Sequence, residues 1–340
     1  MTLYFATVLP GLEAVLEDEI RAKIGDARIA TIERGKVYFT SSREEETLRT
    51  LRTADNLFRF VHRFRVGPHK TDLHHIEREI AALDLDWVAD GRSGPVRCAV
   101  HASRSGKHTY SRFDASSAAM IGLTKRRSRF REGAGGNHEV EFRLDIAHDE
   151  AVFALRLTDS SFRYRKPSRA FAPAAIRPTV AHALVWLSKP APSDTFVDPC
   201  CGSGTIVIER LAYPSRRIVG GDIDEDAVRA AVENAGNEAR LRLHRWDARR
   251  LPLDAGSVDK LVVNLPFGKQ IGSGETIPAL YRDIVNEADR VLTGGGTVIC
   301  MTDAAEPLER AAERFSFEVR ELASLSLKGL HPSVYKLAKR

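Results

Sequence analysis

Short apolar runs alternate with longer amphipathic stretches throughout the second half of the chain. The longer stretches, such as Asp224–Asn234 and Ile277–Leu292, repeat their apolar positions every three or four residues, as amphipathic helices do. Strands that alternate with helices in this way form βαβ units on a parallel sheet. From Phe317 onward the pattern is that of two long strands and a turn, so we expect an antiparallel hairpin to close the sheet. The apolar runs expected to form its buried strands are Thr195–Val197, Ile218–Gly221, Leu241–Leu243, Lys260–Val263 and Thr297–Met301.

The first half has a less regular pattern in which strands dominate. A strand in "LYFATVL", a helix over Gly11–Ile24 and strands in "ARIATIE" and "KVYFTS" have the order β-α-β-β, the start of a ferredoxin-like unit. A second unit follows, with a long helix over Ala115–Arg127. Its strands are expected near Phe58–Val66, Val96–Ser103, Val140–Ile146 and Val152–Leu157.

Three prolines and a basic run interrupt the periodic pattern between residues 160 and 180. We therefore predict an α/β protein whose C-terminal half is a Rossmann-like doubly wound sheet, preceded by two α+β units. The predicted segments are a ferredoxin-like unit over 1–55, a second α+β domain over 56–160, a linker over 161–180 and the doubly wound domain over 181–340.

Composition removes several classes of protein. A chain of 340 residues with 43% hydrophobic and 29% charged residues can bury two or three cores. The four cysteines form no C-x-x-C pair, so neither a disulfide framework nor a zinc site is indicated. No apolar run approaches the length of a membrane span, and the apolar N-terminus carries acids without a basic leader. We expect a cytoplasmic monomer that binds no metal and no membrane.

A glycine-rich turn stands between the first strand of the second half and the helix after it, in "TFVDPCCGSGTIVIERL". Gly202 and Gly204 let the backbone turn tightly and approach a ligand. A nicotinamide site needs a third glycine where Val207 stands. Asp198 ends the strand instead, and a carboxylate there suits the α-ammonium group of S-adenosylmethionine, where a pyrophosphate would be repelled. The alternative for this segment alone is a turn that only packs a helix on a strand.

Two further acids end the next two strands. Asp222 follows "RIVGG", at the distance from the glycine turn at which a carboxylate accepts from two ribose hydroxyls. Asp247 follows "LHRW" and suits the 6-amino group of adenine. One such acid could cap a helix, as we expect of Asp224. Three at successive strand ends favour S-adenosylmethionine as the cofactor.

The fourth strand ends in "NLPFG", beginning at Asn264. The Asn264 side-chain oxygen and the backbone carbonyl of Leu265 or Pro266 can together accept both protons of an exocyclic amine. Such a pair directs the nitrogen lone pair towards a methyl donor without a strong base, through positioning and electrostatics. Phe267 can stack on the target base, and Gly268 leaves room for it. The alternative is a plain turn with its ring in the core.

These motifs resemble those of methyltransferases that act on exocyclic amines, whose fourth motif is (Asp/Asn)-Pro-Pro-(Tyr/Phe). "AIRPTVAHAL" is similar to the helix before the cofactor strand in RNA-modifying members, and the N-terminal half resembles a ferredoxin-like unit followed by a THUMP domain. Together they resemble the THUMP-containing tRNA guanine-N2 methyltransferases, which modify a guanine of the acceptor stem. Leu265 departs from the motif, because it stands where the first proline is commoner.

The resemblance implies two sets of site residues. The catalytic set is Asn264, Leu265, Pro266 and Phe267. The cofactor set is Thr179, Asp198, Gly202, Gly204, Thr205, Asp222, Ile223, Asp247, Ala248 and Asn264.

Basic residues gather in one stretch of the first half. Between Arg97 and Arg131 there are nine basic residues and the single acid Asp114, and a second cluster surrounds Tyr164. A stretch of one sign is typical of phosphate binding, whereas solvated helix faces usually mix signs. The alternative is a basic surface without a partner. The residues expected to bind RNA are Arg104, Lys107, Arg112, Lys125, Arg126, Arg127, Arg129, Arg165, Lys166, Arg169 and Lys269.

The sequence thus predicts a methyltransferase that forms N2-methylguanosine in tRNA, with position 6 implied by the resemblance alone. One alternative keeps the chemistry and changes the base to adenine at N6 or cytosine at N4, in RNA or DNA. Another is a non-catalytic RNA-binding protein that retains a vestigial cofactor fold.

Overall fold

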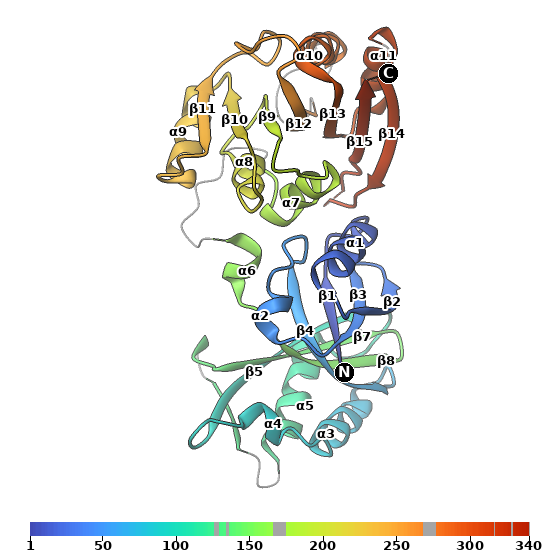
Figure 1. Ribbon diagram of the computed structural model, residues 1–340. Coiled ribbons are helices and arrows are strands. Elements are labelled where there is room, and N and C mark those ends of the chain that lie inside the picture. The colour runs from blue at the N-terminus through green and yellow to red at the C-terminus, as the bar shows by residue number, and fades with distance from the viewer. Residues whose placement is uncertain are drawn as a thin grey trace. The chain divides into compact units, whose positions relative to one another are not determined.

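A computed structural model describes residues 1–125, 129–133, 136–165, 175–267, 277–315, 317–327 and 329–339 (Figure 1). The chain divides into two compact units. One contains most residues up to 159, and the other contains Ser160–Arg340 together with the N-terminal segments Ala6–Tyr38 and Glu46–Asp55. Much of the predicted first segment therefore packs with the C-terminal half.

The C-terminal sheet has seven strands in the order β11-β10-β9-β12-β13-β15-β14. The first five in chain order, β9 to β13, pair in parallel, while β15 pairs antiparallel with both β13 and β14. The doubly wound sheet and its closing hairpin are confirmed. The strands are β9 (Thr195–Asp198), β10 (Arg217–Asp222), β11 (Leu241–Arg245), β12 (Val258–Asn264), β13 (Leu292–Thr302), β14 (Phe317–Ser324) and β15 (Ser333–Lys339).

The strand order reverses at β9, which has β10 on one side and β12 on the other. Loops leave β9 and its neighbours towards opposite faces at such a point, so the carboxyl ends of the strands border a crevice that ligands use. This position is where Asp198, Asp222 and Asn264 end their strands.

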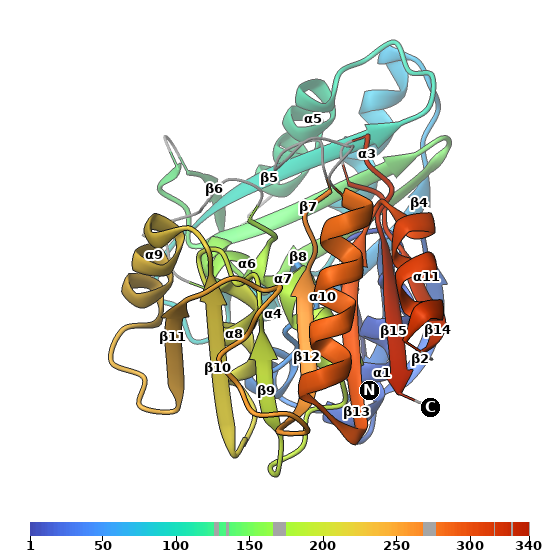
Figure 2. The same ribbon diagram turned by 90° about the horizontal axis from the view of Figure 1, so that it is seen from above.

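Helices cover the sheet because their apolar residues recur at helical spacing. In α10 the buried residues include Ile277, Tyr281, Ile284 and Val291, and Figure 2 shows this helix lying along β12 and β13. Asp224 caps α9 as expected, since its side chain accepts a 2.9 Å hydrogen bond from the Asp226 amide. The helices of this half are α6 (Ser160–Tyr164), α7 (Pro178–Leu187), α8 (Thr205–Arg210), α9 (Glu225–Ala235), α10 (Ile277–Val291) and α11 (Ala305–Arg314).

The strands before residue 160 form an eight-stranded sheet in the order β2-β3-β1-β4-β8-β7-β5-β6. Its strands are β1 (Thr2–Thr7), β2 (Arg28–Glu33), β3 (Lys36–Ser41), β4 (Asn56–Arg65), β5 (Val96–Ser105), β6 (Phe130–Glu132), β7 (Val140–Ala147) and β8 (Glu150–Arg156). The accompanying helices are α1 (Glu13–Lys23), α2 (Glu45–Leu48), a 3-10 turn (Lys70–Asp72), α3 (Leu73–Ala81), α4 (Asp86–Ala89) and α5 (Arg112–Thr124).

The helix predicted over Ala115–Arg127 has different limits. It is α5, and it begins at Arg112 because Ser111 and Asp114 form a capping box. It ends at Thr124, with Lys125 already extended. Arg126 and Arg127 lie outside the described residues. The prediction also omitted α3. Its sequence is mostly polar and rich in histidine, so the helical spacing of its two buried residues, Ile76 and Ile80, was not recognised.

Hydrogen bonds of polar side chains connect α1 and the residues after α2 to α7 and to the segment after α8. Both ring nitrogens of His182, in α7, are hydrogen-bonded, Nδ1 at 3.0 Å from Thr53 Oγ1 and Nε2 at 2.6 Å from the Tyr213 hydroxyl. The buried Glu19 carboxylate accepts from the Arg52 and Thr53 amides at 2.8 and 2.9 Å and from Lys23 at 2.7 Å. The Glu19–His182 network, defined by these residues, explains why the N-terminal segments belong to the C-terminal unit.

Candidate active site

A cavity of about 1050 Å³ opens at the carboxyl ends of β9, β10 and β12. Nearly all of the predicted cofactor and catalytic residues line it. Those that do are Asp198, Gly202, Thr205, Asp222, Ile223, Asp247, Ala248, Asn264, Leu265, Pro266 and Phe267. Residues from four separate strand ends therefore meet around one space large enough for a nucleoside-sized ligand.

Asp198 is buried, with 1% of its surface exposed. Its Oδ1 accepts a 3.2 Å hydrogen bond from the Cys200 amide, while its Oδ2 has no partner among the described residues. Burial, with a smaller contribution from the neighbouring Asp222 charge, raises the pKa of Asp198 well above its usual range. A buried carboxylate oxygen without a donor is costly. A bound cation or ammonium group would remove that cost.

Asp222 is held from both sides by backbone donors. Its Oδ2 accepts from the Gly202 amide at 2.9 Å and its Oδ1 from the Asp224 amide at 3.1 Å. These bonds fix the carboxylate at the edge of the cavity, and each oxygen keeps a lone pair for a ligand hydroxyl. Gly202 has a φ of +52°, a conformation that favours glycine, so the turn that supplies the first amide depends on it.

Asp247 has a partner that the sequence analysis did not consider. Arg249 donates to it from both Nε and Nη2, at 2.9 and 2.6 Å, and this pairing lowers the pKa of Asp247. Both residues line the cavity. An adenine amino group would compete with Arg249 for the same oxygens. The only sequence signal for this ion pair was the position of Arg249, two residues after Asp247.

Two predicted cofactor residues do not line the cavity. The buried Thr179 hydroxyl donates to Asp55 Oδ1 at 2.7 Å, and its neighbours Arg177 and Val180 line the cavity in its place. Gly204 begins α8 with a φ of +81°, and a Cβ there would lie 3.0 Å from the Ala231 side chain. The missing side chain of Gly204 thus makes room for packing α8 against α9, and its approach to a ligand stays a prediction.

A tryptophan that the sequence analysis missed supports the turn after β9. Trp246 donates from Nε1 to the Pro199 carbonyl at 2.9 Å. Its ring lies so close to Gly221 that a Cβ on this glycine would be 2.3 Å from it. Gly221 and Trp246 therefore act together, and only a contact between two strands could show this.

The turn after β12 is tied to the core at both ends. The Leu265 amide donates to the Met301 carbonyl at 3.0 Å, and the Pro266 carbonyl accepts from the Tyr281 hydroxyl at 2.9 Å. Asn264 directly precedes this turn, and its buried Oδ1 has no partner among the described residues. Of the two carbonyls left open by the sequence, that of Pro266 is thus already engaged. Phe267 is half-buried and lines the cavity; Gly268 lies outside the described residues.

Comparison with known proteins gives matches over both halves of the chain. Residues 165–333 match the RMKL-like methyltransferase domain and residues 4–56 the RlmL ferredoxin-like domain. A tRNA (guanine(6)-N2)-methyltransferase of Thermus thermophilus is 31% identical, covering 98% of both chains. The chain belongs to the THUMP-type tRNA guanine-N2 methyltransferase family.

More distant likenesses agree with this membership. A tRNA (guanine(6)-N2)-methyltransferase of Methanocaldococcus jannaschii is 23% identical over 98% of this chain and 99% of its own. The crystal structure of TrmN from Thermus thermophilus superimposes with a TM-score of 0.82 at 28% identity and covers 100% of both chains. The predicted family and fold class are confirmed.

Further residues of this family member line the cavity without having been predicted. Arg163 and Tyr164 come from α6, where the guanidinium lies 4.5 Å from the ring centroid. Their position in the basic run could have been used to predict that they lie near the active site. Leu9, Leu327 and Leu330 also line the cavity, from segments far from the motifs, and nothing in the sequence distinguishes them from core leucines.

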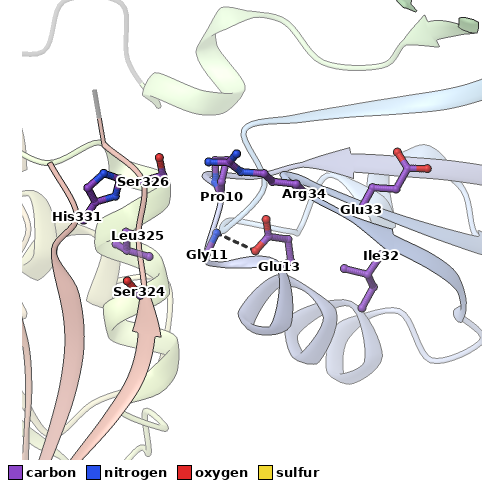
Figure 3. Close-up of a pocket in the computed structure, with 10 residues that line it drawn as sticks. All are labelled: Pro10, Gly11, Glu13, Ile32, Glu33, Arg34, Ser324, Leu325, Ser326 and His331. Carbon is purple, nitrogen blue, oxygen red and sulfur yellow. Dashed lines mark hydrogen bonds between the residues drawn. The ribbon is translucent and has the colours of Figure 1, made fainter. Parts of the chain in front are cut away.

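A smaller cavity of about 450 Å³ is lined by residues that include Pro10, Gly11 and Ser324 (Figure 3). One of its two acids, Glu13, accepts from the Gly11 and Gly35 amides at 2.8 and 2.6 Å. A Cβ on Gly11 would lie 1.9 Å from the Ser324 carbonyl oxygen, so the chain passes very close to the end of β14 here. We regard this cavity as a gap between packed chain segments and not as the active site, since the motif residues line the larger cavity.

The predicted RNA-binding residues fall into three groups. Arg104, Lys107 and Arg112 are exposed around the start of α5. Lys125 is paired with Glu77 at 2.6 Å, and Arg129 donates to the carbonyls of Ala89 and Gly94, so the stretch is less positive than its sequence. Arg126, Arg127, Lys166, Arg169 and Lys269 lie outside the described residues.

Arg165, also predicted to bind RNA, is paired within the protein. Its guanidinium is paired at 3.0 Å with the buried Glu209, and only 16% of its side chain is exposed. A side chain held in this way has little surface left for a phosphate.

Among the residues that the structure describes, no group of three or more His, Cys, Asp or Glu side chains could hold a metal ion, and no helix is long and apolar enough to cross a membrane.

Proposed function

We propose that this protein transfers a methyl group from S-adenosylmethionine to the exocyclic N2 amine of guanine 6 in the acceptor stem of tRNA. The observation that carries the proposal is a pair of buried oxygens without partners, Asp198 Oδ2 and Asn264 Oδ1, on residues that line one cavity. Relatives that match the whole chain are named for guanine 6. The proposal makes tRNA the partner and keeps the expectation of a cytoplasmic monomer without a metal.

The residues present fit the cofactor. Asp198 would hold its α-ammonium group, because that carboxylate is buried and lacks a donor. Asp222, fixed by two backbone amides, would accept from the ribose hydroxyls, and Ile223 is an exposed apolar side chain of the cavity suited to one face of the adenine. When bound, S-adenosylmethionine supplies an electrophilic methyl group on a positively charged sulfur.

The turn after β12 would orient the substrate. An exocyclic amine has two N–H groups; Asn264 Oδ1 would accept one and the Leu265 carbonyl the other, since the Pro266 carbonyl is taken by Tyr281. Two acceptors in the amine plane leave the nitrogen lone pair directed away from them. This positioning lowers the barrier without a general base. The half-buried Phe267 would stack on the guanine.

A methylation assay tests the proposal. Unmodified tRNA transcripts, one with a G6–C67 pair and one with the pair reversed to C6–G67, would be incubated with labelled S-adenosylmethionine and digested to nucleosides. We expect N2-methylguanosine from the first transcript only. N6-methyladenosine or N4-methylcytosine would overturn the choice of base. Absence of product, with the cofactor bound, would favour a non-catalytic RNA-binding protein.

A further inference from the structure

A line of three hydrogen bonds leads from the segment after β13 to the turn that follows Asn264. The Ala304 amide donates to Thr302 Oγ1 at 2.9 Å, Thr302 Oγ1 lies 2.6 Å from the Tyr281 hydroxyl, and that hydroxyl donates to the Pro266 carbonyl at 2.9 Å. Every member belongs to the C-terminal unit.

The direction of each bond in this line follows from its ends. The Pro266 carbonyl has no proton, so Tyr281 must donate to it. A tyrosine hydroxyl has only one proton, so Thr302 donates to Tyr281 and itself accepts from the Ala304 amide. All three donors are used and none competes with another, which makes the line a single polarised unit.

The environment keeps this arrangement rigid. Tyr281 is completely buried and 1% of Thr302 is exposed, so water cannot replace a lost bond. The Tyr281 ring packs in the core cluster that also contains Val263, Leu265 and Cys300. Burial raises the pKa of Tyr281, and the hydroxyl therefore remains a donor at neutral pH.

The hydrogen bond to Pro266 determines the position of a group that faces the substrate. The peptide before Leu265 is anchored through its amide to Met301, and the peptide after Pro266 is anchored through its carbonyl to Tyr281. The peptide between them carries the Leu265 carbonyl, and its nitrogen is that of proline, which has no proton to donate. The direction of that carbonyl is therefore set by its two anchored neighbours.

We propose that Tyr281 is a positioning residue for methyl transfer: by holding the Pro266 carbonyl, it aligns the Leu265 carbonyl with Asn264 Oδ1 as the pair of amine acceptors. The inference rests on the proposed function for its kinetic consequence. Its structural consequence, an anchored turn, does not depend on which base is methylated.

The kinetic test uses Tyr281→Phe, which keeps the ring and removes the hydroxyl. We expect kcat to fall by roughly 10- to 100-fold, as displacement of a reacting group does, with KM for tRNA and Kd for the cofactor within about twofold. Thr302→Val should lower kcat in the same way because the Tyr281 hydroxyl loses its donor. Thr302→Ser keeps the hydroxyl and should retain nearly full kcat.

Tyr213→Phe is the control, since it also removes a hydrogen bond of a tyrosine hydroxyl, here to the buried His182. It should lower the melting temperature without lowering kcat. An equal loss of kcat in Tyr213→Phe would mean that general destabilisation explains both variants, and would overturn the inference. So would a wild-type kcat in Tyr281→Phe.

Amide hydrogen exchange supplies a readout that needs no substrate. In Tyr281→Phe we expect the Leu265 amide, which is hydrogen-bonded to the Met301 carbonyl, to exchange at least roughly tenfold faster, with the β12 amides before Asn264 unchanged. Unchanged exchange at the Leu265 amide would overturn the inference. If the wild-type protein methylates no tRNA, the proposed function fails, and exchange alone decides whether Tyr281 holds the turn.

Discussion

Two buried polar regions of the C-terminal unit differ in one respect. In the Glu19–His182 network both carboxylate oxygens of Glu19 and both ring nitrogens of His182 have partners. In the cavity Asp198 Oδ2 and Asn264 Oδ1 have none among the described residues. Since buried polar groups are normally paired, we expect the first region to stabilise the fold and the second to bind a ligand. Burial alone would not separate them.

The largest expected effect follows from removing an unpartnered oxygen. Asn264→Ala should lower kcat by roughly 10²- to 10³-fold, because the amine loses one of its two acceptors. Cofactor and tRNA affinities and the melting temperature should remain near wild type. The measurement is single-turnover methylation with titration of both ligands. Asn237→Ala, an exposed asparagine of the same unit, is the control and should stay fully active. Full activity of Asn264→Ala would refute its assignment as a catalytic residue.

A pair of matched carboxylate-to-amide variants tests the comparison directly. Asp198→Asn should weaken cofactor binding roughly 10- to 100-fold, because a charged hydrogen bond to the ammonium is lost, without lowering stability. Glu19→Gln should lower the free energy of unfolding by about 3 kcal/mol, because a buried carboxylate with three donors is replaced by a group that also donates. Its cofactor affinity should be unchanged. Calorimetric titration and urea unfolding measure both quantities; the same pattern in both variants would remove the distinction.

The Glu19–His182 network should also make stability depend on pH. Burial, the largest cause, lowers the pKa of His182 from 6.5 to about 4. Between these values the unfolded chain binds a proton that the folded chain does not, so stability is fully present above pH 6.5 and falls as the pH falls towards 4. The total loss is about 3 kcal/mol. Urea unfolding at pH 7, 6 and 5 should show this slope in the wild type and a smaller one in His182→Gln.

The smallest expected effect compares a lysine without an ion pair and a paired lysine at the surface. Lys107 is exposed, and no ion pair of it is seen among the described residues, whereas Lys125 is paired with Glu77. Lys107→Ala should weaken tRNA binding a few-fold and lower the slope of log affinity against log salt by about one. Lys125→Ala should change the slope less. Equal slopes in the two variants would argue against Lys107 as a phosphate contact.

The meeting of the predicted acids and Asn264 around one cavity was predictable because these residues end successive strands. Asp198, Asp222 and Asn264 were identified from position alone, since parallel strands bring their carboxyl ends to one edge. Thr179 and Gly204 do not line the cavity, and their neighbours Asp55 and Ala231 lie far away in the sequence. A glycine in a motif does not reveal whether a ligand or a helix occupies the missing side chain's space.

By itself, the sequence determined the doubly wound sheet, the acids at its edge and the amide turn, because periodicity and strand ends are local properties. Only the tertiary structure decided which polar groups remain unpaired. Glu77 forms an ion pair with Lys125, Glu209 forms one with Arg165, and the Tyr281 hydroxyl donates to the Pro266 carbonyl. The partners in each pair are too far apart in the sequence for a local pattern to predict the contact. Ligand binding depends on the donors and acceptors that have no partner within the protein, and only the packing of the whole unit determines which groups these are.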